Sequence, residues 1–166
     1  MKKLAVYGLL TGLAVAGWTY LEYLFGWHTN TVGRYSGLLA IVFPAIGIIT
    51  GIRAYRDQDK GGVITYWEAV LAGVVITAIA GLIVACFTYF YYTSIHPGLV
   101  DFLVEKKRQA LTERQATAAQ IAAQLRQVRD YHRPLTLTLR SLGGFMGFGL
   151  ITSLILAAVL KKYPQE

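Results

Sequence analysis

Long apolar stretches, separated by clusters of charge, recur four times along the chain. Residues 4–26 contain a single charged side chain, Glu22, and the stretches 35–52, 69–95 and 141–160 contain none. A helix needs about 20 residues to cross a hydrocarbon core of about 30 Å. Because lipid offers the backbone no hydrogen bonds, each stretch must satisfy its own N–H and C=O groups. The pattern predicts an all-α, polytopic membrane protein with four transmembrane helices at about 4–26, 35–55, 64–95 and 135–161, in one domain over 1–166.

Two other interpretations of these stretches fail. Outer-membrane barrels are built from short strands of alternating polarity, which these uniform stretches are not. Lys2 and Lys3 resemble the start of a secretory signal, but the apolar stretch is too long for one, and the cluster of Trp18, Tyr20 and Tyr23 is not a cleavage site. We expect the first stretch to be retained. Four crossings then place both termini on one side of the membrane.

Residues 96–133, between the third and fourth stretches, predict an extramembrane hairpin of two amphipathic helices. The turn-forming sequence from His96 to Gly98 ends the third span, and apolar residues then follow at helical spacing. Thr112 and Gln115 have the spacing of a capping box that opens the second helix. On that helix an apolar face is predicted from Ile121, Leu125 and Val128. Such helices either lie on the headgroups or fold back on the bundle, and a plain solvated connector is the alternative.

Charge sets the orientation. The face with the N-terminus carries seven basic residues, Lys2, Lys3, Arg53, Arg56, Lys60, Lys161 and Lys162, whereas the opposite short loop has only Arg34. The long loop 96–133 also carries seven basic residues on that opposite face, but they are mixed with acidic residues and most lie far from a span end. Cytoplasmic flanks collect Lys and Arg and the first hairpin usually dominates, so both termini are predicted to be cytoplasmic. The net charge of +7 suits anionic lipid headgroups, and nucleic acid is not an expected partner.

Small residues recur at four-residue spacing on every predicted span. Transmembrane helices associate through such positions, where the absence of large side chains lets backbones approach. The predicted helix-packing residues are Gly8, Gly12, Gly47, Gly51, Gly81, Ala85, Gly143 and Gly147. They either pack the four helices against each other or seat a partner's helix or a second copy.

Two charged residues enter the predicted spans at a comparable depth. Glu22 lies near the outer end of the first span, and Arg140 lies near the start of the fourth. Burial of a lone charge in lipid is expensive. We therefore predict an ion pair between Glu22 and Arg140, the alternative being that each side chain reaches the interface separately.

The loop after the second span resembles a calcium-binding loop in part. Asp57 and Asp59 stand at positions one and three, and Glu68 stands at position twelve. Position five is Gly61, which offers no side-chain ligand, so a charged turn is the stronger interpretation. The histidines His28, His96 and His132 lack metal-site spacing and are expected at the interface. No cofactor is predicted, and the loop from Asp57 to Glu68 is the one candidate for a metal in the sequence.

Four motifs stand out along the chain: the sequence from Gly51 to Asp57, then Gly62-x-Ile64-x-Tyr66, then Tyr91-Tyr92-x-x-Ile95-x-Pro97, and the ending from Gly149 to Lys162. Together they resemble a bacterial membrane protein family, the domain of unknown function 4199. The resemblance implies a four-span bacterial inner-membrane protein with no assigned activity or catalytic residue.

The sequence contains no nucleophile with a partner, phosphate loop or intramembrane catalytic motif, so an enzyme is not expected. Our first hypothesis is a structural or accessory subunit that binds another membrane protein or itself. The alternatives are a small oligomeric transporter or channel, and a lipid- or ion-sensing membrane module.

Overall fold

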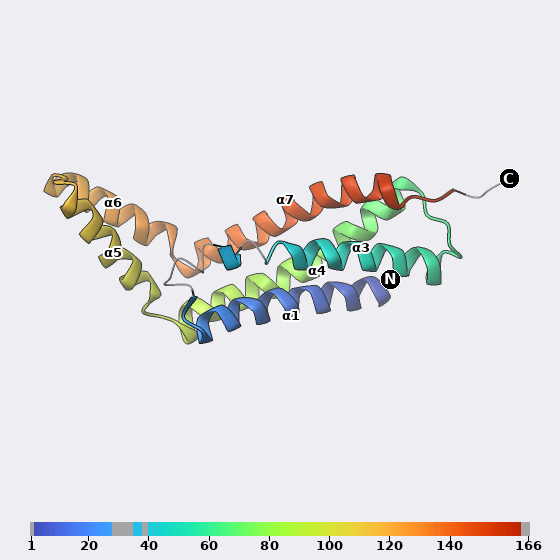
Figure 1. The fold of residues 1–166 in the computed structure, drawn as a ribbon, viewed down its shortest axis with the longest axis horizontal. Coiled ribbons are helices and arrows are strands. Elements are labelled where there is room, and N and C mark those ends of the chain that lie inside the picture. Colours follow the sequence, from blue (N-terminus) through green and yellow to red (C-terminus); the bar gives the residue numbers. More distant parts are fainter. Residues whose placement is uncertain (1, 28–34, 38–39, 164–166) are drawn as a thin grey trace. The chain divides into compact units, whose positions relative to one another are not determined.

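The computed structural model describes residues 2–27, 35–37 and 40–163, and most of these residues are helical (Figure 1). The elements are α1 (Lys2–Leu24), α3 (Val42–Asp59), α4 (Tyr66–Phe90), the π-helix η2 (Tyr91–Ile95), α5 (Leu99–Glu113), α6 (Ala118–Tyr131) and α7 (Pro134–Leu160). The chain forms two compact units. The first comprises Met1–Val84 and Leu142–Glu166, and the second comprises Ala85–Ser141.

In the described part of the chain, four helices are long and apolar enough to cross a membrane. They are Lys2–Leu24, Tyr35–Asp59, Tyr66–Ile95 and Pro134–Leu160. The predicted all-α class is therefore confirmed, and four helices have the length and apolar composition that a membrane span requires. These helices indicate a multi-pass membrane protein.

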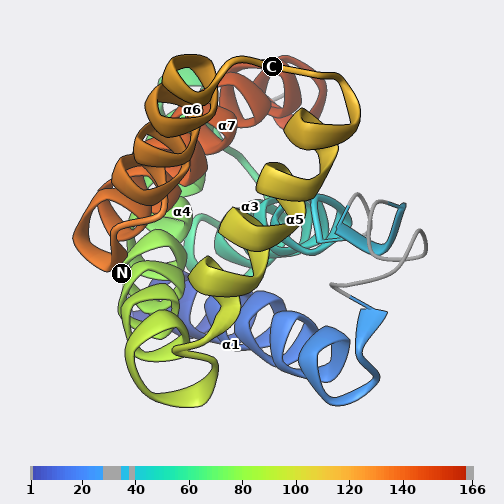
Figure 2. The same ribbon diagram turned by 90° about the vertical axis from the view of Figure 1, so that its left-hand side faces the viewer.

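The core of the first unit lies where α1, α3, α4 and α7 face one another. Ile48 and Ile52 of α3 and Ile76 of α4 are fully buried there, together with Ala157 of α7. Helix α1 lies beside α3 in both views (Figures 1 and 2). Large apolar side chains on the opposite faces, such as Leu71 and Val159, are exposed, as lipid-facing residues of a span would be.

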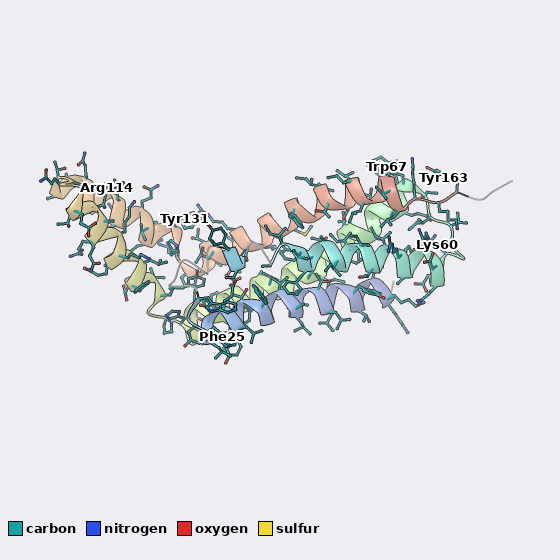
Figure 3. All side chains as sticks on the ribbon, viewed as in Figure 1. Phe25, Lys60, Trp67, Arg114, Tyr131 and Tyr163 are labelled. Atoms are coloured by element: carbon teal, nitrogen blue, oxygen red, sulfur yellow. The ribbon has the colours of Figure 1, made fainter. Side chains whose placement is uncertain are left out.

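One end of the first unit is tied together by polar contacts. The backbones of Ile64 and Lys162 form an antiparallel bridge, with N–H···O distances of 2.9 and 3.0 Å. Lys3 pairs with Asp59 at 2.7 Å, so the start of α1 and the residues that follow α7 both contact the segment around the α3–α4 turn. Lys60, Trp67 and Tyr163 lie here as well (Figure 3). This arrangement agrees with the four predicted spans, because a chain that crosses a membrane an even number of times returns to the side on which it started.

In the second unit, α5 and α6 run antiparallel and pack side by side (Figure 1). Their seam is closed by the buried side chains of Val104, Leu111 and Leu125. Arg114 lies at the tip, where the chain turns from one helix into the next (Figure 3).

The capping box lies five residues later than the sequence spacing predicted. Helix α5 continues through Thr112, whose hydroxyl donates to the carbonyl of Arg108 at 3.0 Å. Gln115 adopts a left-handed φ of 54°, which takes the chain out of the helix. Thr117 then caps α6 in an extended conformation, in a reciprocal capping box with Gln120. An N-cap requires this extended backbone, which Thr112 does not have within α5.

Candidate functional site

The glycines of α1 bring its backbone close to α4. A Cβ atom at Gly8 would lie 2.8 Å from the carbonyl oxygen of Ile76, and one at Gly12 would lie 2.8 Å from Cβ of Ile83. Both distances are shorter than real Cβ contacts. The structure thus places this pair of glycines inside the first unit, in contact with a neighbouring span.

The glycines of α3 are enclosed in the same way. A Cβ at Gly47 would overlap the side chain of Thr11 of α1, and one at Gly51 would overlap Ile76 of α4. A side chain at either position would push two spans apart. Helix α3 therefore packs closely against both α1 and α4.

The tightest contact between α4 and α7 involves residues that the sequence reasoning missed. A Cβ at Gly73 would overlap Ser153, and one at Gly149 would overlap Thr77. Thr77 is 2 % exposed and Ser153 is fully buried. The signal was present, because Gly73-x-x-x-Thr77 and Gly149-x-x-x-Ser153 are also small residues four apart. By contrast, a Cβ at Gly81 would make only ordinary contacts, 3.4 Å from Leu142 and 3.5 Å from Phe145, while Ala85 lies buried in the second unit.

The remaining predicted glycines, Gly143 and Gly147, lie on an open surface of α7, next to Gly144, which was not predicted. At Gly143, Gly144 and Gly147 an added Cβ would meet no atom within 4 Å in the described structure. The exposed side chains of Leu150 and Ile151 continue the same side of the helix, Ile151 with 61 % of its surface accessible. We call these five residues the open α7 face.

An apolar groove of about 310 Å³ adjoins the open α7 face at Gly144. The groove lies between α7 and the first and second spans, and all of its lining belongs to the first unit. Its lining residues are Val15, Ala40, Ile41, Pro44, Gly144, Phe145 and Phe148. None of these side chains carries a charge.

The carboxylates of the calcium-like loop are held by separate partners. Arg56 donates to both oxygens of Asp57, at 2.7 and 3.1 Å, while Asp59 pairs with Lys3. Glu68, in the first turn of α4, accepts from Lys60 at 2.6 Å and also from the backbone N–H and the hydroxyl of Thr65. The hydrogen bond to Glu68 raises the pKa of Lys60. The structure does not bring the three carboxylates together, and no group of three potential metal ligands occurs among the described residues.

Glu22 and Arg140 each have an aromatic partner. The indole N–H of Trp18 donates to Glu22 at 3.0 Å and to the carbonyl of Ser36 at 3.1 Å. The guanidinium of Arg140 lies over the ring of Tyr131, 3.9 Å from its centre. The two charges belong to different units. Their ion pair stays a prediction.

Of the three histidines, two lie in the second unit. The Nδ1 atom of His132 lies 2.8 Å from the carbonyl oxygen of Val128, and the ring of His96 meets that of Tyr91 edge-on. His28 lies outside the described residues.

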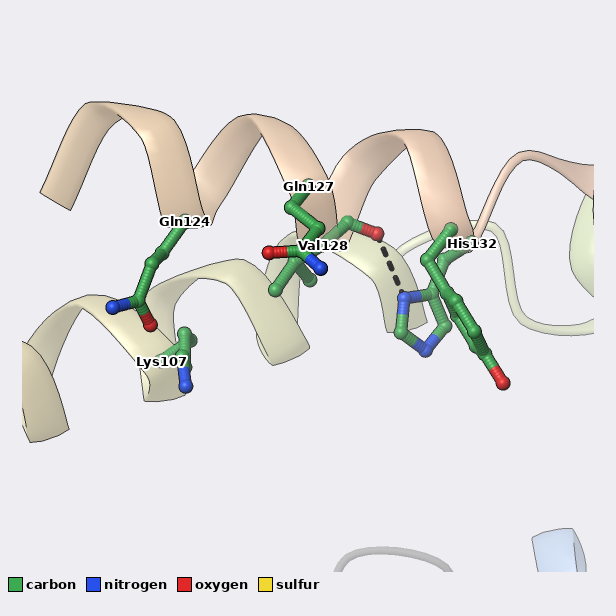
Figure 4. Close-up of a pocket in the computed structure, with 6 residues that line it drawn as sticks. Lys107, Gln124, Gln127, Val128 and His132 are labelled. Atoms are coloured by element: carbon green, nitrogen blue, oxygen red, sulfur yellow. Dashed lines mark hydrogen bonds between the residues drawn. The ribbon is translucent and has the colours of Figure 1, made fainter. Parts of the chain in front are cut away.

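The α5–α6 pair carries grooves on both sides of its seam. One, of about 250 Å³, is lined by Lys107, Gln124, Gln127, Val128, Tyr131 and His132, and Figure 4 shows the hydrogen bond that fixes the imidazole there. A second, of about 190 Å³, is lined by Arg108, Ala122, Leu125, Arg126 and Arg129. The first groove has one lysine as its formal positive charge, whereas the second has three arginines.

A family model described as protein of unknown function (DUF4199) matches residues 6–162. The match includes every motif that carried the resemblance in the sequence, and the resemblance is confirmed. No curated protein and no solved structure matches this chain.

Proposed function

The chain belongs to the DUF4199 family of proteins of unknown function, and from this premise we propose that it is a non-enzymatic accessory subunit of a bacterial inner-membrane assembly. Its partner is a second membrane protein, one of whose transmembrane helices packs on the open α7 face. The proposal rests on one observation above all: α7 presents three glycines that no described part of the chain covers.

The contrast with the other glycines supports this assignment. Gly8, Gly12, Gly47 and Gly51 all lie against a neighbouring span, where a side chain would collide. Lipid tails are as apolar as leucine, so spans gain little from burying apolar side chains and associate through close packing instead. Gly143 and Gly147 would let another helix approach equally closely, and no described atom occupies that space.

The apolar groove beside Gly144 adds a place for a side chain. A helix that crosses α7 at its glycines can insert a large apolar residue between Ile41 and Phe148, which both line the groove. Small residues that admit a backbone, next to a recess that admits a side chain, are the two requirements of a tight helix crossing.

We place both termini in the cytoplasm. Lys3, Lys60 and Lys162 lie at the tied end of the first unit, and clusters of Lys and Arg favour the cytoplasmic side. The α5–α6 pair is then extramembrane on the opposite side, where its charged surface is solvated.

The test is purification of the tagged full-length chain from its native host in a mild detergent, followed by measurement of the mass and composition of the complex. We expect a stoichiometric second membrane protein. Gly147→Leu should release it, because the new side chain occupies the space of the partner's backbone. Gly17→Leu is the matched control, since Gly17 is also exposed on a span with no atom within 4 Å of an added Cβ.

Three outcomes contradict the proposal. A lone monomer would leave the open α7 face without an occupant. A complex of this chain alone, dissociated by Gly147→Leu, would make the face a contact between copies. Equal loss of the partner in Gly147→Leu and Gly17→Leu would place the contact elsewhere.

A further inference from the structure

The groove between α5 and α6 that contains Arg108, Arg126 and Arg129 concentrates positive charge at one place. Arg126 and Arg129 stand one turn apart on α6, and Arg108 comes from α5 across the seam. Three guanidinium groups of like charge around a recess of about 190 Å³ repel one another. An anion bound between the three arginines would relieve this repulsion.

The described part of the chain supplies almost no counter-ion. Arg108 has one loose contact, with Nε 3.7 Å from a carboxylate oxygen of Glu105, beyond hydrogen-bond distance. Asp130, the acidic residue next to Arg129, pairs instead with Arg133 at 2.8 Å. No described carboxylate lies within ion-pair distance of Arg126 or Arg129. The groove is therefore electropositive and its donors are available.

The floor of the groove leaves space for a ligand. Ala122 and Leu125 form it, and Ala122 carries the smallest side chain of the lining. A neighbouring recess of about 350 Å³ shares Arg108, Ala122 and Leu125 and extends toward Ala118. A bound group can thus sit between the arginines, while the rest of its molecule continues along the seam.

We infer that this groove, which we call the arginine groove, binds a phosphate group. Guanidinium is planar, always charged, and presents paired N–H donors that match two oxygens of a phosphate. Lysine lacks this paired geometry, which sets the arginine groove apart from the recess on the other side of the seam, where the cation is Lys107. The phosphate belongs either to an anionic phospholipid headgroup or to a soluble phosphate compound.

Two probes distinguish these sources, both applied to the full-length chain in a maltoside detergent. Isothermal titration with sodium phosphate at constant ionic strength measures binding of the free anion. Native mass spectrometry with added phosphatidylglycerol, and with phosphatidylcholine for comparison, measures binding of a headgroup. We expect saturable binding in at least one arm. Binding of phosphate identifies a soluble ligand, and selective binding of phosphatidylglycerol identifies a lipid.

The decisive variant is Arg126→Gln/Arg129→Gln, which should weaken binding at least about tenfold because two charge-assisted contacts are lost. Lys107→Gln/Arg114→Gln is the matched control: it removes the same charge from the same helix pair, outside the arginine groove, and should change affinity less than about twofold. Ala122→Phe provides a second test, since it fills the floor and keeps every charge. It should likewise weaken binding at least about tenfold, while circular dichroism shows unchanged helix content.

The inference is overturned if neither phosphate nor phosphatidylglycerol binds saturably. It is also overturned if the two charge-removing variants lose affinity equally, because binding would then depend on net charge alone. Retained binding in Ala122→Phe would place the ligand outside the arginine groove.

Discussion

Thr77 of α4 occupies the space that a side chain at position 149 of α7 would need. Its hydroxyl donates to the carbonyl of Gly73 at 2.7 Å, so the side chain is held in place and is almost fully buried. Two spans can approach this closely only because α7 has a glycine at that point.

Gly149→Ala should therefore destabilise the protein. Thr77 is β-branched and buried, and cannot rotate away, so the added methyl group overpacks the contact at a cost of about 1–3 kcal/mol. Thermal unfolding in detergent measures the loss. Gly147→Ala, two residues earlier and open, should stay within about 0.5 kcal/mol of the wild type. Equal melting temperatures for the two variants would contradict the close contact of α4 with α7.

The position of the helix cap gives a second prediction. Thr117→Ala removes the side chain that accepts from the N–H of Gln120, and should cost about 1 kcal/mol. The control is Thr112→Ala, whose hydroxyl only bonds back within α5 and should be close to neutral. Amide hydrogen exchange in the first turn of α6 should rise in the first variant alone. A rise in the second alone would restore the cap to the position that the sequence suggested.

The contact of Arg140 with Tyr131 joins the end of α6 to the start of α7 and is a third test. Tyr131→Phe keeps an aromatic face under the guanidinium and should retain the stability of the wild type. Tyr131→Leu should lose about 0.5–1 kcal/mol. In an Arg140→Gln background the same Leu substitution should have little further effect on the melting temperature. Additive losses would show that the two residues do not interact.

Arg56 links α3 to the end of α7 and gives a fourth prediction. One of its N–H groups donates to the carbonyl of Leu160 at 3.2 Å, next to the Ile64–Lys162 bridge. Arg56→Gln removes this bond, worth about 1 kcal/mol, and should speed amide exchange at Ile64 and Lys162 about fivefold.

Arg53→Gln is the control for that experiment, because Arg53 is exposed one turn earlier on α3. Its amide exchange at the bridge should match the wild type. Unchanged exchange in Arg56→Gln would mean that the backbone bridge holds the end of α7 without the arginine.

The sequence by itself determined the helical class, the four helices that are long and apolar enough to span a membrane, and the family. An uncharged stretch such as 69–95 must be helical in lipid, because every backbone N–H and C=O group must be hydrogen-bonded within its own segment. The end of the third span at His96 is equally local, because Pro97 and Gly98 end a helix whatever surrounds it. The motifs around Arg56 and in the last span were sufficient to identify the family.

Only the tertiary structure decided which small residues pack within the protein and which remain open. Gly8 and Gly147 each belong to a pair of glycines four residues apart on a helix. An added Cβ at Gly8 would collide with α4, whereas one at Gly147 would meet no described atom within 4 Å. The arginine groove was also beyond the sequence, since Arg108 and Arg129 come from different helices and meet only after α5 and α6 pair. A repeated motif fixes how closely a helix can be approached, while the neighbour that approaches it depends on the arrangement of the whole chain.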